Sequence, residues 1–166
     1  MKIHALSRAN MKRMLELSDL NDTNVHDYYN AFFILINNTD EPSLLKDNIN
    51  VKTFYFDDVS DNEVIPKLEI SDTGKINVIS DGYNLNAFTV DQSDVMCSFI
   101  LQNIDKDYCY IHCSAGINRS GSVGSFICDI TRSDYEIFKR TNPKIQGNPL
   151  VTKLLNTSYI KLQSNN

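Results

Sequence analysis

Residues 108–130 constrain the fold of this chain more than any other segment. The stretch "YCYIH" (108–112) has the length and the aromatic and β-branched content of a strand. A short loop with a glycine follows, and apolar residues then recur at helical spacing, namely Val123, Phe126, Ile127 and Ile130. A strand that passes through a tight loop into a buried helix is a building unit of α/β domains.

Apolar patterns elsewhere predict the other elements of one α/β domain spanning 1–166. Strands are expected at 31–36 and 51–56, and a shorter one at 76–80, followed by a turn at 81–84. One helix is expected at 7–17, and a second is expected to start at a capping box formed by Thr89 and Gln92. A third should start at a capping box formed by Ser133 and Glu136 and end before Pro143. A fourth should have Asn148 as its N-cap and Pro149 as its first residue. Residues 62–86 fit this alternation least well, and the family resemblance described below implies that they form an insertion.

The composition excludes several classes of protein. The chain has 166 residues, 42% of them hydrophobic, and a net charge of -5, which argues against a grip on long stretches of nucleic acid backbone. No apolar run approaches the ~20 residues of a membrane helix, and the charged N-terminus is unlike a secretory signal. The cysteines, Cys97, Cys109, Cys113 and Cys128, fit neither a zinc site nor a disulfide framework, which predicts reduced thiols in a cytoplasm.

The loop between the strand and the helix has the properties of an anion site. Backbone N–H groups of such a loop, together with the partial positive charge of the helix N-terminus, attract a phosphate. Arg119 adds a planar fork of donors that can hold two phosphate oxygens. Cys113 lies at the start of the same loop, where these positive groups favour its thiolate. The segment therefore combines a nucleophile with a phosphate cradle.

The chemistry that follows is attack of Cys113 on phosphorus and hydrolysis of the resulting cysteinyl phosphate by water. No metal or other cofactor is expected, because the loop and Arg119 already neutralise the transferred group. The alternative to a catalytic site is a buried structural cysteine in a tight turn beside a surface arginine.

The stretch "HCSAGINRSG" (112–121) resembles the active-site loop of the cysteine-based protein tyrosine phosphatases. In detail it is similar to the dual-specificity branch, which includes small bacterial and viral members. The likeness is strongest over 108–130, and 142–155 resembles the C-terminal helix of small members. The resemblance implies a central, mostly parallel sheet flanked by helices.

The resemblance also implies roles for individual residues. Cys113 would be the nucleophile, and Arg119 would bind phosphate and stabilise the transition state. The cradle would be formed by Ser114, Ala115, Gly116, Ile117, Asn118 and Arg119. Ser120 would assist departure of the thiolate in the second step, and His112 would order the loop through hydrogen bonds.

A leaving alkoxide or phenolate needs a proton, and the family supplies it from an aspartate after an earlier strand. The stretch "FYFDDVSD" (54–61) offers Asp57, Asp58 and Asp61. Alignment by the strand favours Asp57, with Asp58 as the second candidate. Asp81 and Asp91 lie closer to Cys113 in sequence and stay open as further candidates.

The substrate expected from these features is a singly phosphorylated protein. Ser114, Ala115, Ile117 and Asn118 bring no charge to the loop, whereas related phosphoinositide phosphatases often carry lysines there. The phosphorylated residue that we expect the site to accept is phosphotyrosine, together with phosphoserine or phosphothreonine. The alternatives are an RNA 5′-phosphatase on the same fold, which the acidic net charge disfavours, and a phosphate-binding module without catalysis.

Overall fold

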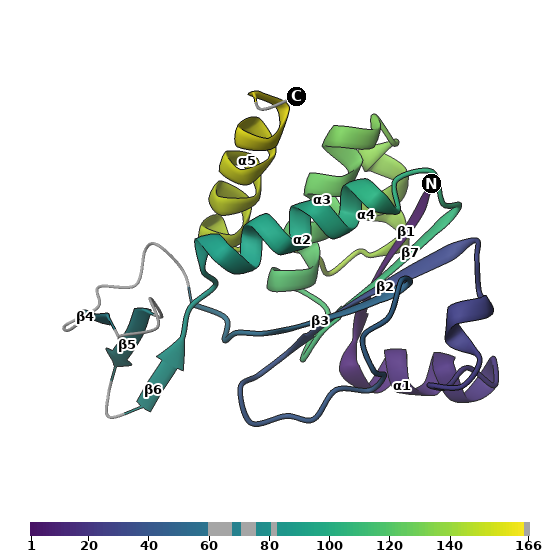
Figure 1. The fold of residues 1–166 in the computed structure, drawn as a ribbon, viewed down its shortest axis with the longest axis horizontal. Helices are drawn as coiled ribbons and strands as arrows, with labels where there is room; N and C mark the ends of the chain where they lie inside the picture. Colours follow the sequence, from purple (N-terminus) through teal and green to yellow (C-terminus); the bar gives the residue numbers. More distant parts are fainter. Residues whose placement is uncertain (60–67, 71–75, 81–82, 165–166) are drawn as a thin grey trace.

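The main sheet has four parallel strands in the order β1-β7-β2-β3 (Figure 1). The computed structural model describes residues 1–59, 68–70, 76–80 and 83–164. The strands are β1 (Lys2–Ser7), β2 (Ala31–Asn37), β3 (Val51–Tyr55) and β7 (Tyr108–Cys113). The expectation of a central, mostly parallel sheet is therefore confirmed, with strands 31–36 and 51–56 present to within one residue.

Strand β1 is the strand of the main sheet that the sequence pattern did not reveal. It pairs along its whole length with β7, from Lys2 opposite Tyr108 to Ser7 opposite Cys113. Only Ile3 and Ala5 of its residues are buried, so the alternation is too short to identify a strand. Its place in the sheet depends on pairing with a distant strand, which single-sequence patterns do not contain.

Helices cover both faces of the sheet (Figure 1). Helix α1 (Arg8–Leu17) lies on one face, and α2 (Val90–Gln102), α3 (Asn118–Thr131), α4 (Tyr135–Thr141) and α5 (Pro149–Ser164) lie on the other. A one-turn 3₁₀ helix spans Val25–Asp27. This arrangement of helices around parallel strands is the α/β architecture that the sequence predicted.

The helix starts were predicted with one error. Thr89 and Gln92 form the expected capping box of α2. The Asn148 Oδ1 accepts a hydrogen bond from the Val151 N–H and caps α5. The Ser133 cap was wrong, because the Asp134 carboxylate accepts from the N–H groups of the first turn of α4 instead. Aspartate and serine are similar in N-cap preference, so two adjacent candidates cannot be separated by sequence.

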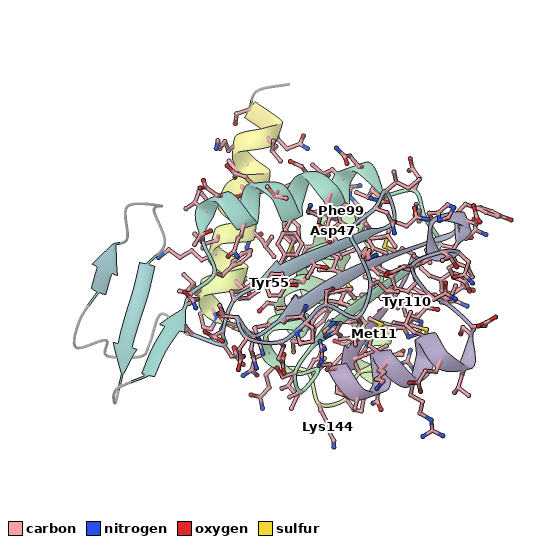
Figure 2. The ribbon with its side chains drawn as sticks, turned by 60° about the horizontal axis from the view of Figure 1, so that its bottom comes forward. Met11, Asp47, Tyr55, Phe99, Tyr110 and Lys144 are labelled. Carbon is pink, nitrogen blue, oxygen red and sulfur yellow. The ribbon has the colours of Figure 1, made fainter. Side chains whose placement is uncertain are left out.

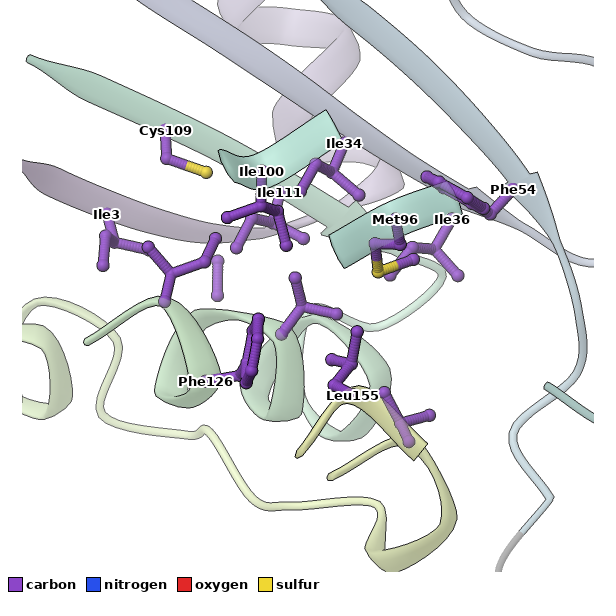
Figure 3. Close-up of a cluster of buried hydrophobic side chains, with 14 of the residues drawn as sticks. Ile3, Ile34, Ile36, Phe54, Met96, Ile100, Cys109, Ile111, Phe126 and Leu155 are labelled. Atoms are coloured by element: carbon purple, nitrogen blue, oxygen red, sulfur yellow. The ribbon is translucent and has the colours of Figure 1, made fainter. Parts of the chain in front are cut away.

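The larger hydrophobic core lies between the sheet and the helices α2, α3 and α5. Figure 3 shows Ile34, Ile111 and Ile100 meeting side chains such as Phe126 of α3 and Leu155 of α5. A smaller core under α1 is built on Met11 and strand β2, and Figure 2 shows Met11 on this helix close to Tyr110 of the sheet. Strand β2 is buried along its whole length, which explains its continuous apolar sequence.

A small antiparallel sheet lies to one side of the main sheet (Figure 1). It consists of β4 (Leu68–Ile70), β5 (Ile76–Ser80) and β6 (Tyr83–Asn86), within the segment that fitted the pattern least well. Strand β5 confirms the strand expected at 76–80. The turn expected at 81–84 was partly wrong, because Tyr83 and Asn84 begin β6, while residues 81 and 82 lie outside the described part of the chain.

The carboxyl end of β7 is placed where a ligand can reach it. Strand β7 lies between β1 and β2, and the chain leaves β1 toward α1 on one face but leaves β7 toward α3 on the opposite face. In open parallel sheets, ligands bind outside the carboxyl ends of strands at such a switch point. The loop 113–118 occupies this position.

Helix α3 packs closely on α4 through Gly124. A Cβ atom at this position would lie 2.3 Å from Cζ of Phe138, whose side chain is buried. Helix propensity alone favours alanine over glycine by about 1 kcal/mol. The overlap with the ring outweighs this gain, because overpacking a core costs about 1–3 kcal/mol.

We therefore expect Gly124→Ala to lower the free energy of unfolding by up to about 2 kcal/mol, measured by urea denaturation. The matched control is the same change made in a Phe138→Leu background, where the smaller side chain leaves room for the methyl group. An equal loss in both backgrounds would contradict the overlap as the cause.

Candidate functional site

The loop at the end of β7 surrounds the sulfur atom of Cys113. The thiol is buried, with a residue exposure of 2%. The Gly116 N–H donates to Sγ over 3.2 Å, and Ser120 Oγ lies 3.3 Å from the same atom. Both groups stabilise negative charge on sulfur when they donate to it. The structure thus places the Ser120 hydroxyl beside the sulfur, and its role in thiolate departure stays a prediction.

Two carbonyl groups of the loop point outward. The Ser114 carbonyl accepts from the Arg8 N–H over 3.2 Å, and the Ile117 carbonyl accepts from the Gln146 N–H over 3.2 Å. A peptide whose carbonyl is held on the outside directs the next N–H toward the inside. Helix α3 then begins at Asn118, which adds its N-terminal dipole to the same concavity. The loop is therefore held in the form of an anion cradle.

Gly116 is required by the shape of this loop. Its φ is 74°, in the left-handed region that favours glycine. A Cβ atom there would also lie 2.4 Å from the Ser7 nitrogen, so the loop touches the backbone at the end of β1 directly. Both observations exclude any larger residue without movement of the loop or of β1.

Arg119 is held with its guanidinium in the site. It is 4% exposed, Nη1 donates to the Phe56 carbonyl over 2.6 Å, and Nη2 donates to Ser114 Oγ over 2.9 Å. The buried Nε–H has no hydrogen-bond partner among the described residues. A phosphate oxygen is the kind of acceptor that a buried, cationic donor requires.

The two candidate general acids, Asp57 and Asp58, differ in their hydrogen bonds. The Asp57 carboxylate accepts from the Asn86 N–H over 2.8 Å, and the Asp57 N–H donates back to the Asn86 carbonyl, which ties the end of β6 to the end of β3. The exposed Asp58 carboxylate accepts from Asn118 Nδ2 over 2.9 Å and from Asn148 Nδ2 over 2.8 Å. Asp58 therefore contacts the loop 113–118 through Asn118. Asp61 and Asp81 lie outside the described residues, and Asp91 lies in the first turn of α2.

His112 precedes Cys113 as expected and is completely buried. Burial and the charge of Arg8 lower its pKa to about 4, so the ring is neutral at pH 7. Neither ring nitrogen has a hydrogen-bond partner among the described residues. The ordering role implied for His112 stays a prediction.

The other three cysteines have no features of a reactive site. All four thiols are free, as expected. Burial raises the pKa of Cys97 and of Cys128 to about 11, and it raises that of Cys109 well above its usual range. These side chains are part of the large core and stay protonated at neutral pH.

Within the described ranges, no cluster of three or more His, Cys, Asp or Glu side chains gathers to hold a metal ion. In the same part of the chain, no helix has both the length and the apolar character needed to cross a membrane.

Three contacts of the site were not found in the sequence. Arg8, Asn118 and Asn148 hold the phosphate loop and Asp58, but they come from three distant segments. The sequence placed Asn118 in the expected cradle and Asn148 at the N-cap of α5, but it gave no sign that either side chain contacts Asp58. An N-cap assignment uses the side-chain oxygen and says nothing about the amide nitrogen, which is the atom that reaches Asp58.

The buried neutral His112 predicts a loss of stability in acid. In the unfolded chain His112 has a pKa near 6.5, whereas in the folded chain its pKa is about 4. The unfolded state therefore binds more protons in this window, and the free energy of unfolding falls as pH falls, by about 3 kcal/mol from this group.

Urea denaturation at pH 7 and at pH 4.5 tests this expectation, with His112→Gln and His112→Asn as variants without the titrating ring. The loss of stability on acidification should be smaller in both variants by about 2 kcal/mol or more. The same loss in wild type and variants would show that His112 is not held neutral.

Comparison with known proteins gives a likeness in structure but none in sequence. No protein family model matches the chain. No curated protein matches it either. The crystal structure of human DUSP28 superposes with a TM-score of 0.51 and 11% identity, covering 99% of this chain and 95% of that one. The structure of PTPMT1 in complex with PI(5)P gives a TM-score of 0.47 and 14% identity, covering 99% and 94%.

The DUSP28 likeness extends over nearly all of both chains. At 11% identity, this structural similarity is evidence for the fold alone. The two proteins therefore share a fold.

Proposed function

We propose that this protein is a phosphatase that hydrolyses phosphate monoesters of proteins through a covalent intermediate on Cys113. The observation that carries the proposal is the arrangement around its sulfur atom. A buried sulfur accepts the Gly116 N–H at the floor of a loop whose arginine, Arg119, keeps a buried donor that has no partner in the described part of the chain. This arrangement supports roles for Cys113 as the nucleophile and for Arg119 as the phosphate-binding cation of one loop.

The reaction has two steps. The Cys113 thiolate attacks phosphorus, the bond from phosphorus to the leaving oxygen breaks, and an aspartic acid of the 57–58 pair gives that oxygen a proton. A water molecule then attacks the phosphocysteine, the resulting aspartate accepts its proton, and the S–P bond breaks to release phosphate and thiolate. The Ser120 hydroxyl, 3.3 Å from the sulfur, donates to the departing thiolate.

The loop N–H groups and Arg119 stabilise the charge that develops on the transferred phosphoryl group. Groups fixed before the reaction act without reorganisation, and removing one such donor typically costs about 10²–10³ in kcat. Arg119 is fixed in this sense by the Phe56 carbonyl and by Ser114. No step requires a cofactor.

The substrate we propose is a protein carrying phosphotyrosine, with phosphoserine and phosphothreonine as further substrates. The loop has no side-chain charge besides Arg119, which suits a single phosphate group. A reducing compartment such as the cytoplasm would keep the Cys113 thiol available.

The test is hydrolysis of para-nitrophenyl phosphate in the presence of a chelator, with Cys113→Ser as the variant. We expect activity in the wild type and a loss of more than about 1,000-fold in the variant, because the alcohol replaces the thiolate nucleophile. Binding of inorganic phosphate to the variant, measured by calorimetry, should persist because the cradle is intact.

Equal activity in both proteins would contradict the proposal. Binding of phosphopeptide without turnover in the wild type would also contradict it and would identify a phosphate-binding module. If the wild type is active, a phosphotyrosine peptide should be hydrolysed faster than RNA with a 5′-phosphate, and the reverse order would contradict the substrate proposed.

A further inference from the structure

We propose that Asp58 is the residue that protonates the leaving group, and that Asn118 and Asn148 are positioning residues that hold it over the phosphate loop. This inference rests on the proposed phosphatase function. The sequence favoured Asp57 for this role, and the contacts of the two carboxylates differ in a way that favours its neighbour.

The contacts of Asp57 give it a structural task. Its carboxylate and its N–H bond to the N–H and the carbonyl of Asn86, and the Asn86 side chain continues to Thr39 Oγ1 over 2.8 Å. These bonds connect the loop after β3 with the end of β6 and with the loop after β2. The bond of the Asp57 carboxylate joins the loop after β3 to β6, whereas the bonds of the Asp58 carboxylate join the same loop to Asn118 and to the start of α5.

The contacts of Asp58 direct it to the reacting loop. Asn118 and Arg119 are consecutive residues of the phosphate loop, and they bond to Asp58 and to the Phe56 carbonyl, respectively. Two side chains of the cradle therefore hold the aspartate loop at positions two residues apart. Asp58 is exposed between the buried Phe56 and the buried Val59, so a bound substrate can reach its carboxylate.

Asn148 fixes the same loop from the other side. Its Nδ2 donates to Asp58 Oδ1 and to the Val59 carbonyl, both over 2.8 Å, while its Oδ1 caps α5 by accepting from the Val151 N–H. The side chain is 2% exposed, and its main chain bonds to Ser122 of α3. One asparagine therefore connects the start of α5, helix α3 and the aspartate loop.

The Asn118 side chain suits an aspartate that alternates between two protonation states. Its Nδ2 donates to the ionised carboxylate, and its Oδ1 is a buried acceptor without a partner among the described residues. A carboxamide turned by half a rotation presents the oxygen instead, and this oxygen can accept from a protonated Asp58. The same side chain can thus hold the acid before proton transfer and the base after it.

The experiment compares two substrates that differ in how much they need the proton. Nitrophenolate leaves readily without one, whereas phenolate does not, so loss of the acid should slow phenyl phosphate more than para-nitrophenyl phosphate. The matched pair is Asp58→Asn and Asp57→Asn, two isosteric changes at adjacent positions. We expect the first to lower kcat on phenyl phosphate by about 100-fold or more, with a smaller effect on the nitrophenyl ester. The second should lower both rates equally and by little.

The positioning residues are tested by Asn148→Ser, Asn148→Asp and Asn118→Ser. Serine and aspartate at 148 keep an oxygen that can cap α5, but they remove the donors to Asp58, and aspartate adds repulsion. We expect kcat on phenyl phosphate to fall by about ten-fold in the serine variants and further in Asn148→Asp, with KM unchanged and a smaller loss on the nitrophenyl ester. The decline of kcat at high pH, which a protonated donor produces, should be lost in Asp58→Asn only.

Two outcomes would overturn this inference. One is a preferential loss on phenyl phosphate in Asp57→Asn but not in Asp58→Asn. The other is an equal loss of kcat on both substrates when Asn118 or Asn148 is replaced, which would show that these two residues have a purely structural role. Failure of the proposed function itself is distinguishable, because the wild type would then hydrolyse neither ester.

Discussion

The loop after β7 packs with its backbone directly against the backbone at the end of β1, and the site depends on this approach. Gly116 makes the approach possible, since a Cβ atom there would overlap the Ser7 nitrogen and the Leu6 carbonyl carbon. The same close packing lets the Arg8 N–H bond to the Ser114 carbonyl. The glycine therefore determines which way the peptide groups of the loop face. Strand β1 supports the loop although its own sequence carries almost no strand signal.

The loop in turn organises the groups around it. Arg119 and Asn118 reach across to the loop after β3, and Gln146 supports the Ile117 carbonyl from the segment before α5. Each contact joins segments far apart in the chain, so the site forms only when the whole sheet and its helices are in place. Because these side chains are held by folded structure, little ordering is left to occur when a phosphate binds.

The part of this site that is local in sequence was predictable, and the part that is not local was not. The strand, the glycine loop and most of the helix lie within 108–130, so apolar periodicity identified the strand and the helix, and the motif between them pointed to Cys113 and Arg119. The pairing of Asp58 with Asn148 joins residues 90 positions apart, which no local pattern encodes. Alignment of a strand end with that of a related family is uncertain by one residue. Because Asp57 and Asp58 are adjacent, that one residue decides which carboxylate is assigned to the loop.

The central claim is that phosphate is transferred to the sulfur of Cys113. Mixing the protein with para-nitrophenyl phosphate, quenching in acid within one turnover and locating the added phosphoryl group by peptide mass spectrometry tests it most directly. The account predicts a phosphoryl group on Cys113 and none in Cys113→Ser. Turnover in the wild type with the phosphoryl group on another residue, or with no covalent adduct at any time, would contradict it.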